Sequence, residues 1–381
     1  MKIGILTQPL QSNYGGLLQN YALQQVLIRE GHEVETLDWG ESRNIRSRLY
    51  RLKRQLLATL FPQKCSKASY KLTQRERTVI CGNTNSFKEK YIYHSTVMHS
   101  FKDFKCYTEK SGFDVYIVGS DQCWRPSYNS FLTSMFLDFS EGQIVKRIAY
   151  AASFGTDMWE FSPKQTETCA SLAKKFNFIS VREDSGVKLC RDHLGVYAVH
   201  VLDPTMLLTK KDYLYLINAE NEPQSEGTLF NYILDPTPDK SAFVNKVARE
   251  KGLKTFQVLP KFQAETRTKE DIKKHIEDCV FPRVTTWLRA FMDAEMTIVD
   301  SFHGMVFSII FNKPFWVIGN KERGMSRFTS LLKMLGLESR IVNFDELDSI
   351  DINQPINWSN INRILEDKRS ECANLLIDNL K

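Results

Sequence analysis

The chain has 381 residues, which is long for one hydrophobic core and sufficient for two domains. Hydrophobic residues make up 42% of it and charged residues 25%, an ordinary globular composition that excludes disordered and fibrous proteins. The net charge of +6 is uneven, because residues 43–77 contain eleven Lys or Arg and a single acid, Glu76.

The N-terminal apolar run is too short for a signal peptide, and no stretch approaches membrane-spanning length, so we expect a cytoplasmic protein. The eight cysteines occur singly, without CxxC or CxH spacing, and predict neither a metal site nor a disulfide framework. Cys123 is the one thiol considered as a nucleophile. A free buried thiol is the simpler interpretation, because no base is evident beside it.

The basic segment, residues 43–77, contains interleaved apolar side chains between residues 49 and 61, as in an amphipathic helix. Through residues 43–61 such a helix could lie on anionic lipid at the inner face of a membrane, or the segment could hold an anionic substrate. A solvated helix face is the alternative. The motifs of common RNA- and DNA-binding modules are missing, so we expect no nucleic-acid partner.

The chain opens with a predicted β–α–β unit. It comprises a strand at Lys2–Leu6, a polar loop at Gln11–Gly16, a helix at Leu17–Arg29 and a strand at Glu33–Asp38. The loop sequence NYGG lacks the spacing of a dinucleotide fingerprint, so we interpret the loop as an anion- or substrate-binding element and not as evidence for NAD.

Further strands and one helix follow in the first half of the chain. They are predicted at Thr84–Lys90 (helix), Val115–Val118, Arg147–Ala152, Phe178–Val181 and Val199–Leu202.

Polar residues follow two of these strands directly. Ser120, Asp121 and Gln122 come after one strand, where a carboxylate and an amide can grip or deprotonate a hydroxyl, with turn capping as the alternative. Arg182 follows another strand and suits forked recognition of a carboxylate or phosphate, unless it pairs with an acidic neighbour such as Glu183.

We place a domain boundary near residue 210, between an N-terminal domain (1–210) and a C-terminal domain (211–381) that ends in a helix. The second half repeats the alternation, and this implies two mainly parallel sheets. Its elements are predicted at Thr228–Leu234, Lys240–Lys251 (helix), Thr255–Leu259, 268–293 (two helices), Met296–Val299, Phe315–Ile318 and 359–380 (helix).

Residues 296–311, MTIVDSFHGMVFSIIF, are predicted to form a buried strand, a tight turn and a buried helix. Asp300, Ser301 and His303 then lie at a strand-to-helix junction, where open α/β sheets bind ligands and helix amides face anions. An ordinary turn capped by Asp300 or Ser301 is the alternative. The loop at 320–327 adds three cations, which are either ligand contacts or solvent-facing.

Several motifs in order resemble the polysaccharide pyruvyl transferase family. They are NYGGLLQNYALQ (13–24), VGSDQCW (118–124), YAASFG (150–155), SVRE (180–183), LDPT (202–205) and VDSFHG (299–304), followed by KPF and RGMSRF. The resemblance implies an α/β fold of two Rossmann-like domains facing a cleft, as in GT-B glycosyltransferases.

The family's enzymes transfer the enolpyruvyl group of phosphoenolpyruvate to two hydroxyls of one sugar, which leaves a cyclic pyruvate ketal and phosphate. The resemblance therefore implies phosphoenolpyruvate as a co-substrate, without a cofactor. It implies as acceptor a sugar of a surface polysaccharide or of its lipid-linked precursor. Two alternatives remain, namely a GT-B-type glycosyltransferase using a nucleotide sugar and a catalytically inactive carbohydrate-binding relative.

Carried onto this sequence, the resemblance implies His303 as the acid or phosphate ligand and Arg182 as the holder of the donor anion. We expect Asp121 to be the base from the strand order, because it directly follows a strand. We expect donor contacts from Asn13, Tyr14, Gly15, Gly16, Ser301, Gly304, Lys321, Arg323 and Arg327. We expect acceptor contacts from Gln19, Ser120, Gln122 and Asp300.

The chain departs from the family at one place. It has Ser301, Phe302 and His303 where several members have Arg-Leu-His, so one expected cation is absent. Lys321, Arg323 or Arg327 could supply it from the facing loop.

Overall fold

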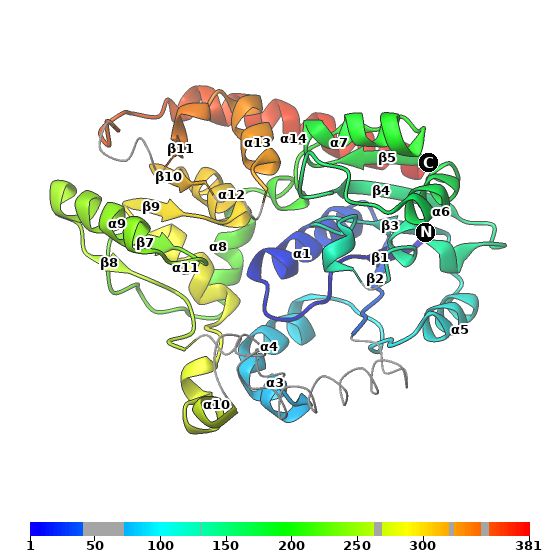
Figure 1. Ribbon diagram of the computed structural model, residues 1–381, viewed down its shortest axis with the longest axis horizontal. Coiled ribbons are helices and arrows are strands. Elements are labelled where there is room, and N and C mark those ends of the chain that lie inside the picture. Colours follow the sequence, from blue (N-terminus) through cyan, green and yellow to red (C-terminus); the bar gives the residue numbers. More distant parts are fainter. Residues whose placement is uncertain (41–71, 130, 263–268, 320–323, 344–349) are drawn as a thin grey trace.

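The computed structural model describes residues 1–40, 72–129, 131–262, 269–319, 324–343 and 350–381. Within these residues the chain forms two parallel sheets, each flanked by helices, in two lobes that lie side by side (Figure 1). Most of the predicted amphipathic region, residues 43–71, lies outside the described residues, and its membrane contact stays a prediction.

The first sheet has strand order β2-β1-β3-β4-β5-β6, and all described pairs are parallel. Its strands are β1 (Lys2–Leu6), β2 (Glu33–Thr36), β3 (Val115–Val118), β4 (Lys146–Ala152), β5 (Phe178–Val181) and β6 (Val199–His200). The helices around it are α1 (Tyr14–Arg29), α3 (Gln74–Ile80), α4 (Gly82–Tyr91), α5 (Phe101–Ser111), α6 (Pro163–Ala173) and α7 (Asp184–Leu189). The central strand β3 reads VYIV and is buried throughout, as expected for a strand covered on both faces.

The second sheet has the order β11-β10-β9-β7-β8 and is also parallel. Its strands are β7 (Leu229–Tyr232), β8 (Thr255–Phe256), β9 (Met296–Val299), β10 (Phe315–Ile318) and β11 (Ile341–Val342). Its helices are α8 (Lys210–Ala219), α9 (Pro238–Lys251), α10 (Lys269–Lys274), α11 (Val284–Asp293), α12 (Phe302–Ile310), α13 (Ser326–Leu335) and α14 (Trp358–Leu380).

The terminal helix α14 does not stay with the second sheet. It runs across the top of both lobes in Figure 1, and the Lys146 ammonium of β4 donates a hydrogen bond to the Leu380 carbonyl at 2.8 Å. Apolar residues of both lobes also share one continuous core cluster. The sequence assigned this helix to the C-terminal domain alone, whereas the structure uses it to join the two lobes.

The predicted strands at β3, β5, β9 and β10 are confirmed with their limits. The loop predicted at Gln11–Gly16 is wrong in its second half, because it ends at Asn13. Tyr14, Gly15 and Gly16 belong to the first turn of α1, which starts three residues before the predicted Leu17. Because glycine is a weak helix former, the sequence pattern predicted too late a start for this helix.

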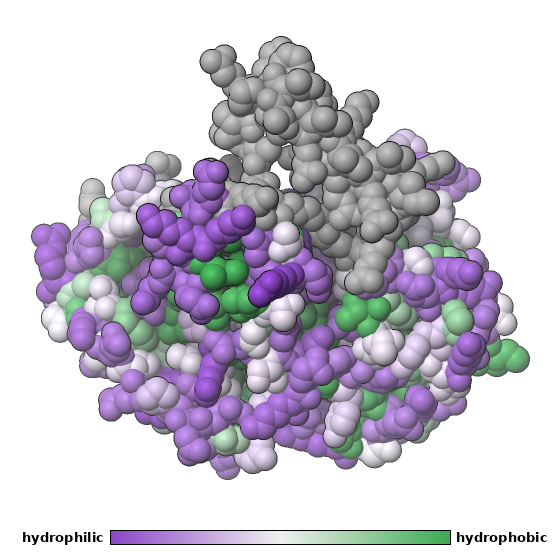
Figure 2. Space-filling model, turned by 90° about the horizontal axis from the view of Figure 1, so that it is seen from below, coloured by the Kyte–Doolittle hydropathy of each residue, from purple (hydrophilic) through white to green (hydrophobic). Residues whose placement is uncertain are grey.

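No described helix is long and apolar enough to cross a membrane. On the face seen in Figure 2, hydrophobic residues of the described part appear as separate patches among hydrophilic ones.

Candidate active site

A cavity of about 460 Å³ lies between the lobes. Its lining residues are Gln8, Pro9, Gln11, Ser12, Asn13, Gly15, Asp121, Gln122, Tyr128, Tyr232, Leu234, Trp287, Asp300, Ser301, Phe302, His303, Arg327 and Phe328. They come mainly from the segments that follow β1, β3, β7 and β9. In each sheet these two strands are neighbours between which the strand order reverses, and such a reversal creates a ligand-binding crevice at the carboxyl ends.

His303 enters this cavity from the first turn of α12. The Ser301 hydroxyl caps the helix by accepting a hydrogen bond from the Gly304 amide at 2.9 Å. The imidazole packs against α1 of the other lobe, where a β-carbon on Gly15 would come within 2.0 Å of His303 Nδ1. Only glycine at position 15 permits this approach. The contact with His303 therefore explains why a weak helix former occupies this position in the first turn of α1.

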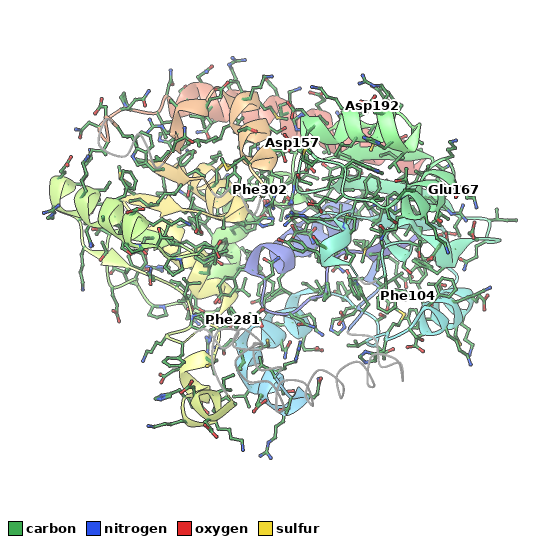
Figure 3. The ribbon with its side chains drawn as sticks, viewed as in Figure 1. Phe104, Asp157, Glu167, Asp192, Phe281 and Phe302 are labelled. Carbon is green, nitrogen blue, oxygen red and sulfur yellow. The ribbon has the colours of Figure 1, made fainter. Side chains whose placement is uncertain are left out.

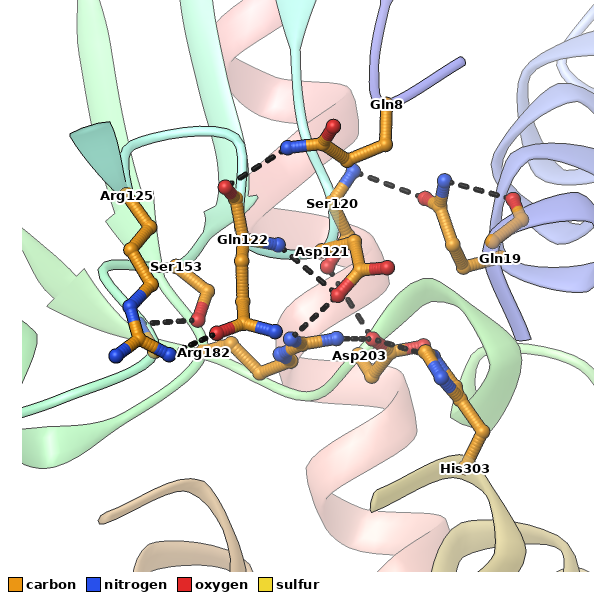
Figure 4. Close-up of polar contacts among 12 residues, drawn as sticks. Gln8, Gln19, Ser120, Asp121, Gln122, Arg125, Ser153, Arg182, Asp203 and His303 are labelled. Atoms are coloured by element: carbon orange, nitrogen blue, oxygen red, sulfur yellow. Dashed lines mark hydrogen bonds and ion pairs between the residues drawn. The ribbon is translucent and has the colours of Figure 1, made fainter. Parts of the chain in front are cut away.

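The other imidazole nitrogen of His303 faces a buried carboxylate. Its Nε2 lies 3.6 Å from Oδ2 of Asp203, which follows β6 in the first lobe. Asp203 also accepts hydrogen bonds from Nη1 of Arg182 at 2.7 Å and from the Ser120 hydroxyl at 3.2 Å. Figure 4 shows this chain of contacts, which links His303 of one lobe to Arg182 and Asp121 of the other.

Asp121 stands where the segment after β3 turns into the cavity. Its backbone adopts the left-handed region with φ 65°, which asparagine and aspartate tolerate better than most residues. The carboxylate accepts hydrogen bonds from Asn13 Nδ2 at 3.0 Å and from Arg182 Nη2 at 3.2 Å. Asn13 thus holds Asp121 from across the cavity wall.

Both carboxylates of this network are ionised at neutral pH. Burial alone would raise the pKa of Asp203, but His303 and Arg182 outweigh it and hold the pKa well below the usual range. Burial likewise opposes ionisation of Asp121, and the charges of Arg182, His303 and Arg327 lower its pKa overall.

Arg182, expected to hold the donor anion, lies behind the cavity wall. It is 2% exposed, is absent from the cavity lining, and directs two of its nitrogens to Asp121 and Asp203. A paired and covered guanidinium reaches a ligand only through these carboxylates, so this geometry does not support the predicted direct contact of Arg182 with the donor. Its position also fixes Phe302, whose ring lies 4.4 Å from the guanidinium carbon.

Arg327 is the described cation from the second lobe that lines the cavity. It is 6% exposed, and its guanidinium carbon lies 5.8 Å from the Phe302 ring, which sits at the junction of the lobes (Figure 3). Burial, followed by the nearby charge of Arg182, lowers the pKa of Arg327 to about 10. Lys321 and Arg323, the other predicted donor cations, lie outside the described residues.

Asp300 lines the cavity but is already engaged. Both of its oxygens accept hydrogen bonds from the turn after β7, from the Leu234 amide at 2.7 Å and the Asp235 amide at 3.1 Å. Lys240 adds an ion pair at 2.6 Å. Asp300 therefore joins two segments of the second lobe, and because it also lines the cavity, its contact with the acceptor stays a prediction.

The remaining predicted contacts divide into two groups. Asn13, Gly15, Ser301 and Gln122 line the cavity, and Gly304 lies behind Ser301, to which its amide is bonded.

The second group lies behind the wall. Tyr14 donates from its hydroxyl to the Pro282 carbonyl at 2.9 Å, and Gly16 packs against Asn13. Gln19 accepts a hydrogen bond from the Ser120 amide at 2.9 Å, and Ser120 donates to the Ala151 carbonyl at 2.8 Å. The cavity lining includes none of these four residues, so this geometry does not support their predicted ligand contacts.

Cys123 is fully buried, and burial raises the pKa of its thiol to about 12. A thiol in this state supplies almost no thiolate at neutral pH, so the nucleophile hypothesis is wrong. Within the described ranges, no group of three or more His, Cys, Asp or Glu side chains is arranged to bind a metal ion.

Sequence reasoning missed Asp203. It belongs to the LDPT motif at 202–205, directly after a predicted strand, and this position was the available signal. The aromatic residues of the cavity wall, Tyr128, Tyr232 and Trp287, were also not predicted, because no local pattern marks them as cavity-lining.

Comparisons with known proteins identify the family and the fold of the chain. The family model for polysaccharide pyruvyl transferase matches residues 13–322. No curated protein sequence matches the chain.

The fold is similar to that of Arabidopsis thaliana UGT89C1 complexed with UDP-L-rhamnose, at 9% identity and a TM-score of 0.53, over 99% of this chain and 98% of that one. It is also similar to S. aureus MnaA with UDP, at 10% identity and a TM-score of 0.51, over 100% of this chain and 96% of that one. A third similar structure is UDP-GlcNAc 2-epimerase from Neisseria meningitidis bound to UDP-GlcNAc, at 10% identity and a TM-score of 0.50, over 100% of this chain and 99% of that one. These likenesses establish the GT-B architecture of two Rossmann-like domains. The family match extends over most of the sequence and includes every residue of the His303–Asp203–Arg182–Asp121 network, and the chain belongs to the polysaccharide pyruvyl transferase family.

Proposed function

We propose that the chain transfers the enolpyruvyl group of phosphoenolpyruvate to two hydroxyls of one sugar, in a surface polysaccharide or its lipid-linked precursor. The observation that carries this proposal is the interlobe pairing of His303 with the buried carboxylate Asp203, beside the buried cation Arg327. Together they offer a proton and a positive charge within one cavity. A small donor with two anionic groups and a protonatable double bond matches both.

Anion binding in this cavity would begin with Arg327. Burial lowers the pKa of its guanidinium to about 10, so a negative charge brought into the cavity would stabilise the charged form. A donor carboxylate or phosphate would do this through charge-assisted hydrogen bonds. The N-terminus of α12 faces the same space with the amides of its first turn, a second location suited to negative charge.

His303 would act as the acid. It gives its proton to the methylene carbon of phosphoenolpyruvate, and positive charge develops at the neighbouring carbon that bears the phosphate. Asp203 keeps the ring oriented and balances the imidazolium charge before the proton leaves, as carboxylates do for histidines elsewhere. Arg182 holds Asp203 in place and does not contact the donor.

Asp121 would serve the acceptor. A sugar hydroxyl adds to the carbocation-like centre and loses its proton to Asp121, whose carboxylate lies on the cavity wall. Its lowered pKa makes it a weak base, which suffices because a hydroxyl becomes strongly acidic as it bonds to that centre. Phosphate then leaves, and the second hydroxyl closes the ketal ring. The two hydroxyl protons end on the new methyl group and on phosphate, so the reaction balances without a redox partner.

Phosphate release tests this function. The protein is incubated with phosphoenolpyruvate and a panel of methyl glycosides, and free phosphate and product mass are followed. The proposal requires phosphate release that depends on an acceptor and yields a ketal of that sugar. Release of UDP or GDP from a nucleotide sugar, with no phosphate from phosphoenolpyruvate, would instead establish a glycosyltransferase. Donor binding without turnover on any acceptor would establish an inactive relative.

A further inference from the structure

A second cavity, of about 340 Å³, lies beside the first in the N-terminal lobe. Its described lining includes Gln11, Trp39, Gln74, Arg77, Asn85 and Lys88. Gln11 lines both cavities, so one turn of the segment after β1 separates them. A ligand that extends from the first cavity across Gln11 would therefore enter the second. The volume of the second cavity is within the range of small-molecule sites.

The charges of this second cavity are largely balanced inside it. The Lys88 ammonium lies 3.1 Å from Asp38 and 3.4 Å from Glu89. Lys88 and Asp38 are both buried, so this pair shapes the wall and does not present an open charge. Arg77 and His99 also have interactions of their own. A cavity whose charges are already paired favours an uncharged ligand, because a charged one would displace or repel an existing partner.

The remaining lining suits a hydroxyl-rich ring. Gln11, Gln74 and Asn85 supply carboxamides, which both donate and accept hydrogen bonds, as sugar hydroxyls require. Among the described contacts, the side chain of Asn85 on α4 has no hydrogen-bond partner.

One aromatic side chain, Trp39, also lines this wall, and 5% of it is exposed. Trp39 is held rigid by a hydrogen bond from its indole nitrogen to the Thr7 carbonyl at 2.7 Å and by edge contact with Phe131 at 5.6 Å between ring centroids. The exposed part of this ring can contact the apolar face of a pyranose at little conformational cost, because the ring is already fixed.

We propose that this second cavity binds the uncharged sugar unit adjoining the one that receives pyruvate. The inference rests on the proposed function, because it places the modified sugar in the first cavity, near Asp121. It adds acceptor contacts in the N-terminal lobe, where Gln19 and Ser120 lie behind the wall of the first cavity. Specificity for the acceptor chain would then depend on α3, α4 and the segment after β2, all in the N-terminal lobe. The donor would bind in the interlobe cavity.

The test compares acceptors of two lengths. The best methyl monosaccharide from the panel and a disaccharide ending in the same sugar are assayed with wild type and Asn85→Ala. The loss of one hydrogen bond raises the KM for the disaccharide about fivefold to tenfold and leaves the KM values for the monosaccharide and phosphoenolpyruvate unchanged. Asn218→Ala is the matched control, since Asn218 is an exposed helical asparagine on α8, away from both cavities.

Two results would overturn the second subsite. One is a wild-type KM that is no lower for the disaccharide than for the monosaccharide. The other is an Asn85→Ala variant that changes both acceptors equally or neither.

Binding of fluorescently labelled protein to immobilised mono-, di- and trisaccharides gives a readout independent of turnover. If wild type binds the longer glycans and Asn85→Ala binds them more weakly, the subsite is supported. This holds even if phosphoenolpyruvate is never consumed, in which case only the proposed chemistry fails. No binding to any glycan, together with no turnover, would reject the subsite as well.

Discussion

Substitution of Gly15 by alanine is the sharpest perturbation of the interlobe contact. The new β-carbon would lie 2.0 Å from His303 Nδ1 and 2.2 Å from its Cγ, whereas ordinary contacts begin at 3.4 Å. The imidazole must therefore retreat by about 1.4 Å, the difference between these distances. It cannot do so and keep both its position in the cavity and its distance to Asp203.

The expected effect falls on catalysis more than on stability. Misplacement of a reacting group by about 1 Å can cost about 100-fold in rate, and we expect kcat/KM for phosphate release to fall by at least that factor in Gly15→Ala. Alanine is a better helix former than glycine by about 1 kcal/mol, which partly offsets the clash. The melting temperature should therefore change by no more than about 4 °C.

Two further glycines serve as controls. Gly82 begins α4, and a β-carbon added to it would have no atom within 4 Å, so Gly82→Ala should behave as wild type. A β-carbon on Gly16 would come within 3.0 Å of the Asn13 side chain, which contacts Asp121, so Gly16→Ala should have an intermediate effect. A Gly15→Ala variant with kcat/KM within threefold of wild type would refute the proposed position of His303 in the reaction.

Asp203→Asn should retain the fold and lower kcat at least about 100-fold, because the His303 imidazolium loses its partner; His303→Ala should have an effect of the same size, because it removes the acid. Near-normal turnover of either variant in a phosphate-release assay would exclude the pair from the mechanism. Arg327→Gln should raise the Kd for phosphoenolpyruvate at least about tenfold in calorimetry. The control is Arg191→Gln, since Arg191 is exposed and pairs with Asp192 away from the cavity. Equal affinities of Arg327→Gln and wild type would exclude Arg327 as the donor cation. Since the pKa of Arg327 is lowered to about 10, donor affinity should be constant up to about pH 9 and weaken as pH rises through 10, where the guanidinium loses its charge. Cys123→Ala should keep kcat within threefold of wild type, because the buried thiol takes no part in the reaction. Loss of turnover in a folded variant would show that the thiol is required.

The sheets were largely predictable because their strands are short apolar runs bounded by glycine and polar residues. β3 and β9 were located to the residue for this reason, and His303 was located with β9. Parallel strands must also end at one edge of their sheet, which brought Asp121 to the cavity.

The partners of these residues were not predictable from spacing. Asp203 meets His303 across 100 positions of sequence, and Lys240 meets Asp300 across 60, so neither ion pair has a local signature. Burial produced the other errors. The sequence pattern of a polar residue after a strand is the same whether the side chain lines a cavity or is covered. Arg182 is covered and pairs with two carboxylates.

The most direct measurement is a crystal structure of the protein soaked with phosphoenolpyruvate. The account predicts electron density between the lobes, with one anionic end of the donor on the Arg327 guanidinium and the methylene carbon facing the His303 imidazole. Donor bound outside this cavity, or with its methylene turned away from His303, would contradict it.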